Sequence, residues 1–158
     1  MKKMKLIFLD IDGVLNSNNW FKHCDEVLGK GQLTNNFCPE AIEELNHIVK
    51  TTEAKVVITS TWRVLQSKKE LQKHFKEEGL NCEIIDTTPV LKTERGIEIQ
   101  TWLDQTKLTI EAFVIIDDIN DMPSLEEDLV LIDSNTGLTK DYRNLIKEKL
   151  KKRSSLIG

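Results

Sequence analysis

The sequence has few cysteines, no long apolar run and no excess of basic residues, and each absence argues against a class of protein. The three cysteines (Cys24, Cys38 and Cys82) lack Cys-x-x-Cys spacing, which argues against a disulfide framework or a zinc site and predicts reduced thiols in a cytoplasmic protein. No apolar run approaches the roughly 18 residues that cross a bilayer. The net charge of −4 argues against a nucleic-acid coat protein, which is normally basic, although it leaves room for a local basic patch.

The length and the balance of residue types fit a compact globular protein. A chain of 158 residues favours a single domain and can bury a core of its own. The 39% of hydrophobic and 30% of charged residues are ordinary for a soluble protein. The apolar start at residues 6–9 imitates a signal peptide, but Asp10 and Asp12 end it too early. We therefore expect one domain over residues 1–158.

Short β-branched runs alternate along the chain with segments of helical periodicity. The sequence predicts strands over residues 5–9, 55–59, 82–85, 113–116 and 129–132. It predicts helices over residues 39–49, 67–79, 95–103 and 142–150. The strands are apolar throughout, which indicates burial on both faces. This order predicts a Rossmann-like, doubly wound α/β fold with a mainly parallel sheet and ligands at the carboxyl ends of the strands.

One stretch, residues 16–37, has no clean period and contains Asn, Ser, Gly and Thr beside Trp20, Phe21 and Phe37. We interpret it as a short flap anchored by a few aromatic side chains. It is too short to be a large cap domain.

Pairs of carboxylates follow two very apolar strands. Asp10 and Asp12 come after the first strand, and Asp117 and Asp118 come after a later one, with Asp121 close behind. If these strands are neighbours about 4.8 Å apart, the acids meet at one edge of the sheet. Clustered carboxylates need a cation, and Mg²⁺ prefers oxygen ligands and substrate phosphates. Asp is common at strand ends, but that preference explains two such pairs poorly, so we expect a magnesium site here.

The first pair has the spacing that phosphoryl transfer needs. Asp10 and Asp12 point to the same side of an extended segment, so that one can attack an electrophile while the other reaches the leaving group. Gly13 lets the backbone turn and lets a substrate approach closely. We expect hydrolysis of a phosphomonoester through an aspartyl-phosphate, which divides one hard step into two easier ones.

Donors for the phosphate oxygens follow the other strands. Thr59 and Ser60 end the second strand, and their hydroxyls are candidate phosphate ligands, although an ordinary helix cap is the alternative. Lys92, Arg95 and Arg63 are candidates for the cation that offsets the phosphate charge. Taken alone, each of these cations is more often a solvated surface charge than a phosphate ligand. Arg95, at the start of a predicted helix, is the favoured one.

These motifs resemble a known superfamily. Residues 10–16 (Asp-Ile-Asp-Gly-Val-Leu-Asn) resemble the first motif of the haloacid dehalogenase-like (HAD) phosphatases, residues 56–60 the second, and residues 115–118 with Asp121 the fourth. A narrower resemblance, to the small HAD domain of some RNA-repair proteins, rests on residues 60–63, 95–99, 102–103 and 136–139.

The resemblance implies roles for these residues. It makes Asp10 the nucleophile and Asp12 the general acid and then the base. It implies Mg²⁺ held by Asp10, the Asp12 carbonyl, and Asp117 or Asp118. It also gives the phosphate contact to a hydroxyl at the end of the second strand.

The chain departs from many superfamily members because it has no long insertion for a cap. In the superfamily an open site often accompanies a larger substrate or a partner that completes the pocket, which leaves room for a nucleotide or a nucleic-acid terminal phosphate. The expected partner is a phosphorylated small molecule or a nucleotide, with a nucleic-acid end as the further alternative. Trp20 or Trp62 could stack a base, although both are more often scaffold residues.

Two other classes stay open. A receiver-like signalling module also combines acids, Mg²⁺ and a lysine, but its acceptor ends the third strand, and here that strand ends near Asp86 without the partner pattern. A catalytically silent HAD-like binding domain would retain clustered carboxylates at a cost in stability.

Overall fold

The computed structural model describes residues 2–29 and 36–151. Its elements, in chain order, are β1 (Lys3–Leu9), α1 (Asn18–Leu28), α2 (Pro39–Thr52), β2 (Lys55–Ile58), α3 (Trp62–Leu65), α4 (Lys68–Glu77), β3 (Ile84–Thr87), α5 (Arg95–Gln105), β4 (Thr109–Asp117), β5 (Leu129–Leu131) and α6 (Arg143–Lys149). Single 3₁₀ turns precede β5 and α6. No helix in these two described ranges has the length and apolar content needed to cross a membrane.

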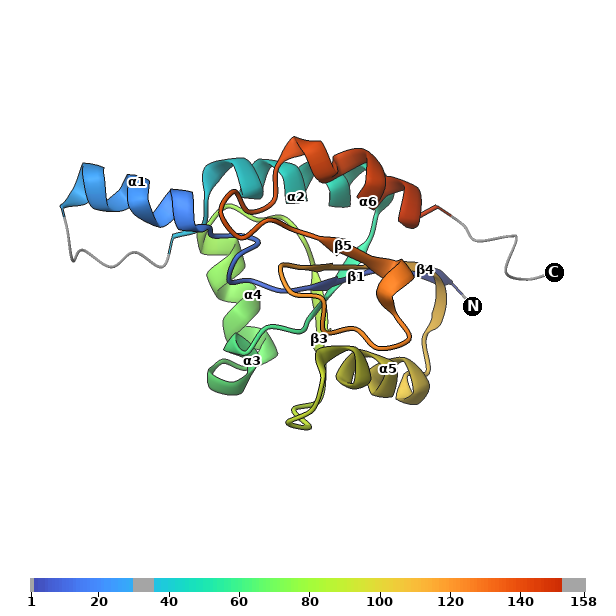
Figure 1. The fold of residues 1–158 in the computed structure, drawn as a ribbon. Coiled ribbons are helices and arrows are strands. Elements are labelled where there is room, and N and C mark those ends of the chain that lie inside the picture. Colours follow the sequence, from blue (N-terminus) through green and yellow to red (C-terminus); the bar gives the residue numbers. More distant parts are fainter. Residues whose placement is uncertain (1, 30–35, 152–158) are drawn as a thin grey trace.

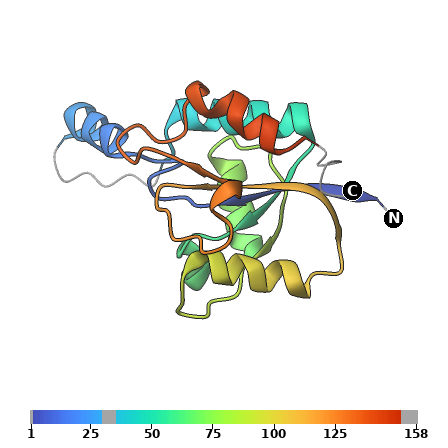
Figure 2. The same cartoon turned by 45° about the vertical axis from the view of Figure 1, so that its right-hand side comes forward.

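The strands form one parallel sheet in the order β3-β2-β1-β4-β5. Figures 1 and 2 show α2 and α6 over one face and α5 over the other. The chain runs outward from β1 in one direction and then, beginning at β4, in the other. The predicted Rossmann-like, doubly wound α/β fold is therefore confirmed.

Two hydrophobic cores cover the two faces of the sheet, and the alternation of side chains along each strand divides residues between them. In β1, Ile7 and Leu9 pack in the core with α2, α4 and α6. Leu6 and Phe8 of the same strand pack in the second core, which α5 contributes to. The strands are apolar at successive positions because both of their faces are buried, as predicted.

Strand ends differ from those predicted, because pairing and not apolar content fixes them. Polar residues extend β1 and β4 toward their amino ends, where Lys3 pairs with Thr109. The third strand was expected at residues 82–85 and instead spans Ile84–Thr87, where it pairs with β2 through a register shift that follows Val56.

The expected flap contains a helix, α1, that the sequence did not predict. Ser17 caps it by accepting a hydrogen bond from the backbone N–H of Trp20. Figure 1 shows α1 projecting from the body of the protein. Phe21 and Val27 are exposed and Cys24 is buried. With Trp20 these residues recur at helical spacing, but the period covers only part of residues 16–37 and was therefore missed. Residues 30–35 of the expected flap lie outside the described ranges. In the described part, this stretch contains no cap domain.

Candidate active site

Asp10, Thr59 and Asp117 lie in one row across three adjacent strands, β2, β1 and β4. The last residue of β1 pairs with the last residue of β2 and with the penultimate residue of β4. The next residue along the chain is therefore Thr59 after β2, Asp10 after β1, and Asp117, which is the last residue of β4. Two backbone hydrogen bonds of 3.0 Å, from Asp10 N to Ile116 O and from Thr59 N to Leu9 O, continue the sheet to this row. Side-chain alternation places the row on the face that α5 covers.

Three carboxylates meet at this row. Oxygens of Asp10, Asp117 and Asp118 all lie within 4.8 Å of one another. Gly13 has a φ of +82°, and a Cβ at this position would lie 2.3 Å from Oδ2 of Asp118, so only glycine fits. The acids are hard oxygen donors from two loops, and this donor set fits Mg²⁺.

Arg95, the first residue of α5, lies against two of these acids. Its Nη1 is 2.8 Å from Oδ2 of Asp117 and 3.1 Å from Oδ1 of Asp10. The backbone N–H of Arg95 also donates to the carboxylate of Asp121 over 3.2 Å. Among the three cations suggested by the sequence, Arg95 is therefore the one in contact with the acid cluster.

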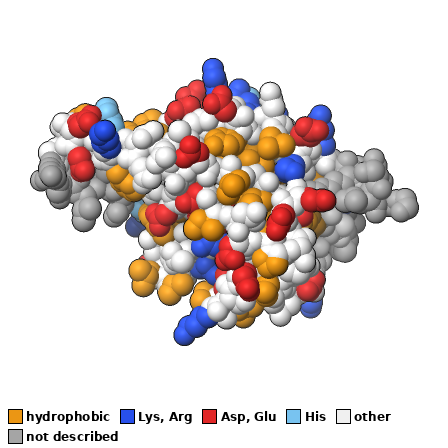
Figure 3. Space-filling view, in the orientation of Figure 1, with side chains coloured by type: hydrophobic (Ala, Val, Ile, Leu, Met, Phe, Trp, Pro, Cys, Tyr) orange, Lys and Arg blue, Asp and Glu red, His pale blue; other side chains and the backbone are white. Residues whose placement is uncertain are grey.

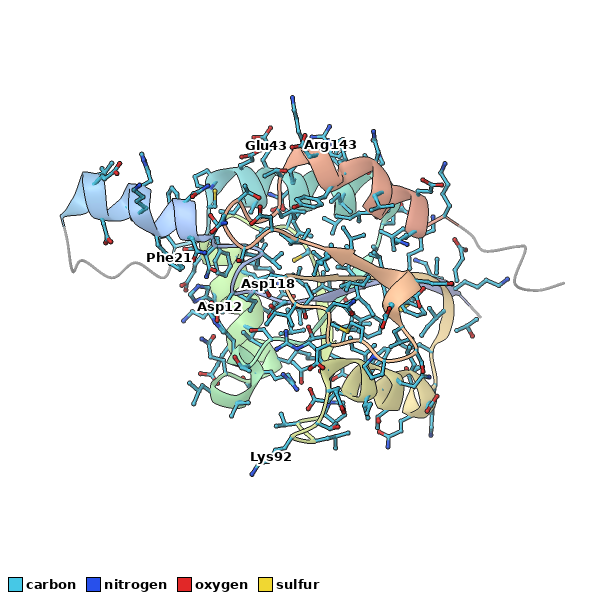
Figure 4. The ribbon with its side chains drawn as sticks, viewed as in Figure 1. Asp12, Phe21, Glu43, Lys92, Asp118 and Arg143 are labelled. Carbon is cyan, nitrogen blue, oxygen red and sulfur yellow. The ribbon has the colours of Figure 1, made fainter. Side chains whose placement is uncertain are left out.

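The other two candidate cations lie elsewhere. The side chain of Arg63 is buried, pairs with Glu98 at 2.8 Å and donates to backbone carbonyls of residues 59–60 and 88–89. It thus joins the loop after β2 to the loop after β3 and to α5. Lys92 is exposed, and Figure 4 shows it projecting away from the acids.

Burial and mutual repulsion alter the acids' protonation. Burial and the charge of Asp117 raise the pKa of Asp10 from its ordinary value of 3.8 to about 8, although Arg95 acts in the opposite direction. Burial also raises the pKa of Asp117, against the effect of Arg95. Without a bound cation Asp10 therefore keeps its proton at pH values where a carboxyl group is normally ionised.

The two hydroxyls after β2 have different surroundings. Oγ of Ser60 accepts a hydrogen bond from the backbone N–H of Trp62 over 3.2 Å. Oγ1 of Thr59 is buried and has no hydrogen-bond partner. Buried polar atoms are nearly always paired, so an unpaired hydroxyl in the row of Asp10 suits an oxygen of a bound ligand.

Asp12 lies beside the cluster, with both of its carboxylate oxygens held by neutral donors. Oδ1 accepts from the side-chain amide of Asn16 at 3.1 Å, and Oδ2 accepts from Nε1 of Trp62 at 3.0 Å. The Trp62 ring packs against Phe37 and His74. The sequence suggested Trp62 only as a ring for stacking, and its bond to Asp12 was missed because 50 residues separate the two.

Trp20, the second tryptophan proposed for stacking, lies on α1. Its Nε1 donates a hydrogen bond of 2.9 Å to the backbone carbonyl of Asn36, and its ring stacks on His23.

The sequence matches a known protein family. The model of a family described as the HAD domain in Swiss Army Knife RNA repair proteins matches residues 6–142. The chain belongs to this family, as its motifs suggested. No curated protein matches the chain significantly, and no solved structure does.

Proposed function

We propose that this member of the HAD phosphatase superfamily is a magnesium-dependent phosphomonoester hydrolase that works through an aspartyl-phosphate on Asp10. The single observation that carries the proposal is the position of the Asp10 carboxylate, which is buried among Asp117, Asp118 and Arg95 at the carboxyl ends of the strands. A carboxylate in such a cluster serves no purpose in packing, whereas it suits nucleophilic attack on a phosphate.

In the first step a carboxylate oxygen of Asp10 attacks phosphorus, and the bond from phosphorus to the leaving oxygen breaks. Asp12 donates its proton to that oxygen, so the product leaves as an alcohol. Arg95 offsets negative charge near the phosphate, and the Thr59 hydroxyl donates to one of its oxygens.

In the second step Asp12, now ionised, takes a proton from a water molecule. The water oxygen attacks phosphorus, and the bond from phosphorus to the Asp10 oxygen breaks. Inorganic phosphate leaves, and Asp10 is again a carboxylate. Asn16 and Trp62 hold Asp12 in place through both steps.

The residues proposed to hold Mg²⁺ are Asp10, the Asp12 carbonyl, and Asp117 or Asp118. Bound Mg²⁺ would neutralise the charge of the phosphate and of the acids around it. Its binding requires the raised-pKa acids to lose their protons, so metal affinity increases with pH.

The proposed substrate is a nucleotide or the terminal phosphate of a nucleic acid. The family is described as a domain of RNA repair proteins, and the described residues contain no cap that would enclose a small substrate. The proposed location is the cytoplasm, where thiols such as the three free cysteines stay reduced.

The test is release of inorganic phosphate by the purified protein. The substrates are p-nitrophenyl phosphate, nucleoside monophosphates and oligonucleotides phosphorylated at the 3′ or the 5′ end, each with Mg²⁺ or with EDTA. We expect Mg²⁺-dependent release that Asp10→Asn abolishes and that Asp25→Asn, an exposed change on α1, leaves intact.

Three results would contradict the proposal: release that survives Asp10→Asn, no release from any ester, or a stable phosphorylated protein without turnover. The last would favour a receiver-like module, and the second would favour a silent binding domain.

A further inference from the structure

A pocket of about 240 Å³ adjoins the acid cluster. Asp117 of the cluster and Arg95, which contacts it, both line this pocket. Its other walls come from the start of α3, the loop between β3 and α5, and the loop after β4. The pocket therefore lies beside the place proposed for the phosphate, where a group attached to that phosphate would be in reach.

Apolar side chains from three separate elements line this pocket while remaining exposed. Val64 of α3 is 59% exposed, Val90 of the loop before α5 is 51% exposed, and Ile119 after β4 is 60% exposed. Figure 3 shows hydrophobic atoms over α3 and charged atoms of both signs between α3 and α5. Exposed apolar groups gathered at the opening of a charged site indicate a surface that a ligand covers.

Four of the six charged side chains that line the pocket are paired with one another, and the other two are Lys92 and Asp121, whose carboxylate accepts the backbone N–H of Arg95. Arg63 pairs with Glu98, and Arg95 pairs with Asp117. The threonines at positions 61 and 93 add hydroxyls to the lining. A ligand group in this pocket would thus meet apolar walls, two hydroxyls and the charged groups of Lys92 and Asp121, which suits a flat ring that carries several hydrogen-bonding atoms.

We propose that this pocket is the subsite for the leaving group and that Val64, Val90 and Ile119 bind the base of a nucleotide whose phosphate lies at Asp10. The inference rests on the proposed function for the place of the phosphate. The pocket is smaller than the roughly 300–1,000 Å³ of sites that hold whole drug-sized ligands, so it fits one base and not a peptide segment.

The test compares two ligands that differ by the base alone, adenosine 5′-monophosphate and ribose 5-phosphate. Binding is measured by calorimetry in Mg²⁺ with the Asp10→Asn protein, so that neither ligand is consumed. We expect the nucleotide to bind about tenfold more tightly, because burying the base against apolar walls adds to the affinity.

The walls are tested by the double change Val64→Thr and Val90→Thr, made in the same Asp10→Asn background. We expect it to reduce the preference for the nucleotide to less than about threefold while affinity for ribose 5-phosphate stays the same. Val27→Thr is the matched control, since Val27 is 66% exposed and lies near the far end of α1.

Equal affinity for the two ligands, no binding of either, or a preference that survives the double change would overturn the subsite. Because these measurements need no turnover, they are distinct from the phosphate-release test. Phosphate release that depends on Asp10, together with equal affinities, would leave the proposed function standing and reject the subsite alone.

Discussion

The indole nitrogen of Trp62 donates a hydrogen bond of 3.0 Å to Oδ2 of Asp12, the proposed general acid. Trp62→Phe keeps an aromatic ring against Phe37 and His74 and removes this donor. We expect kcat/KM for alkyl or nucleoside phosphates to fall about tenfold, because a poor leaving group needs a well-placed proton donor. We expect p-nitrophenyl phosphate, whose leaving group needs no proton, to change less than about twofold.

Trp102→Phe is the control for this prediction. It removes the same kind of bond, 2.7 Å from the indole to Asp86, at a site away from the acid cluster. Equal losses for both leaving groups in Trp62→Phe would show that Trp62 supports the fold and does not position Asp12.

The Thr59→Val variant tests whether the Thr59 hydroxyl serves activity and not stability. The change replaces a buried, unpartnered hydroxyl with a methyl group of similar size. We expect the free energy of unfolding to stay the same or to rise by about 1 kcal/mol, because an unsatisfied polar atom is removed. Phosphate release should nevertheless fall by about 10²–10³-fold, since a donor to the phosphate is lost. Urea unfolding and steady-state kinetics measure the two effects.

Ser60→Ala tests the alternative hydroxyl. Oγ of Ser60 already accepts the backbone N–H of Trp62, so we expect a smaller effect on activity than from Thr59→Val. A larger loss from Ser60→Ala would assign the phosphate contact to Ser60.

The raised pKa of Asp10 predicts how the stability of the metal-free protein varies with pH. A carboxyl group whose pKa rises on folding, here to about 8, stabilises the folded state when it is protonated. Its contribution to the free energy of unfolding is therefore complete below about pH 4 and is lost as pH rises toward 8. The Asp10→Asn variant has no titrating carboxyl group at this position, so it does not lose stability in this way as pH rises. In EDTA we therefore expect the variant to gain in melting temperature over the wild type as pH rises from 5 to about 8.

Magnesium should reverse the pH trend in the wild type. Mg²⁺ replaces protons on the acids, so its stabilising effect should be larger at about pH 8 than at about pH 6. Differential scanning calorimetry across this range provides both measurements. A difference in melting temperature between variant and wild type that does not change with pH would contradict the assignment of a raised pKa to Asp10.

Glu98→Gln tests the buried pair with Arg63. The side chains of both residues are almost inaccessible, and the change leaves the guanidinium charge without its partner. We expect a loss of about 3 kcal/mol in the free energy of unfolding, because an unpaired buried charge is costly. Glu77→Gln breaks the exposed pair with Lys73 and should cost less than about 0.5 kcal/mol. Similar losses from both changes would contradict the prediction.

The sequence predicted the framework because its signals are local. Apolar runs at successive positions identified doubly buried strands, and β1 ends at Leu9, directly before Asp10, as its residues suggest. The helix α1 was missed because residues 16–37 as a whole show no clean period, although its own apolar residues recur at helical spacing. The polar ends of β1 and β4 were missed because only pairing with a neighbour makes them strands.

By itself, the sequence determined the order of the five strands and of the helices α2, α4, α5 and α6, and it placed acids just after buried strands, since both follow from residue type and short-range periodicity. The tertiary structure alone decided that Arg95, and not Arg63 or Lys92, contacts Asp10, and that Trp62 bonds to Asp12. The physical reason is distance along the chain: these contacts join residues that dozens of positions separate, and only the packing of α3 and α5 against the sheet brings them together.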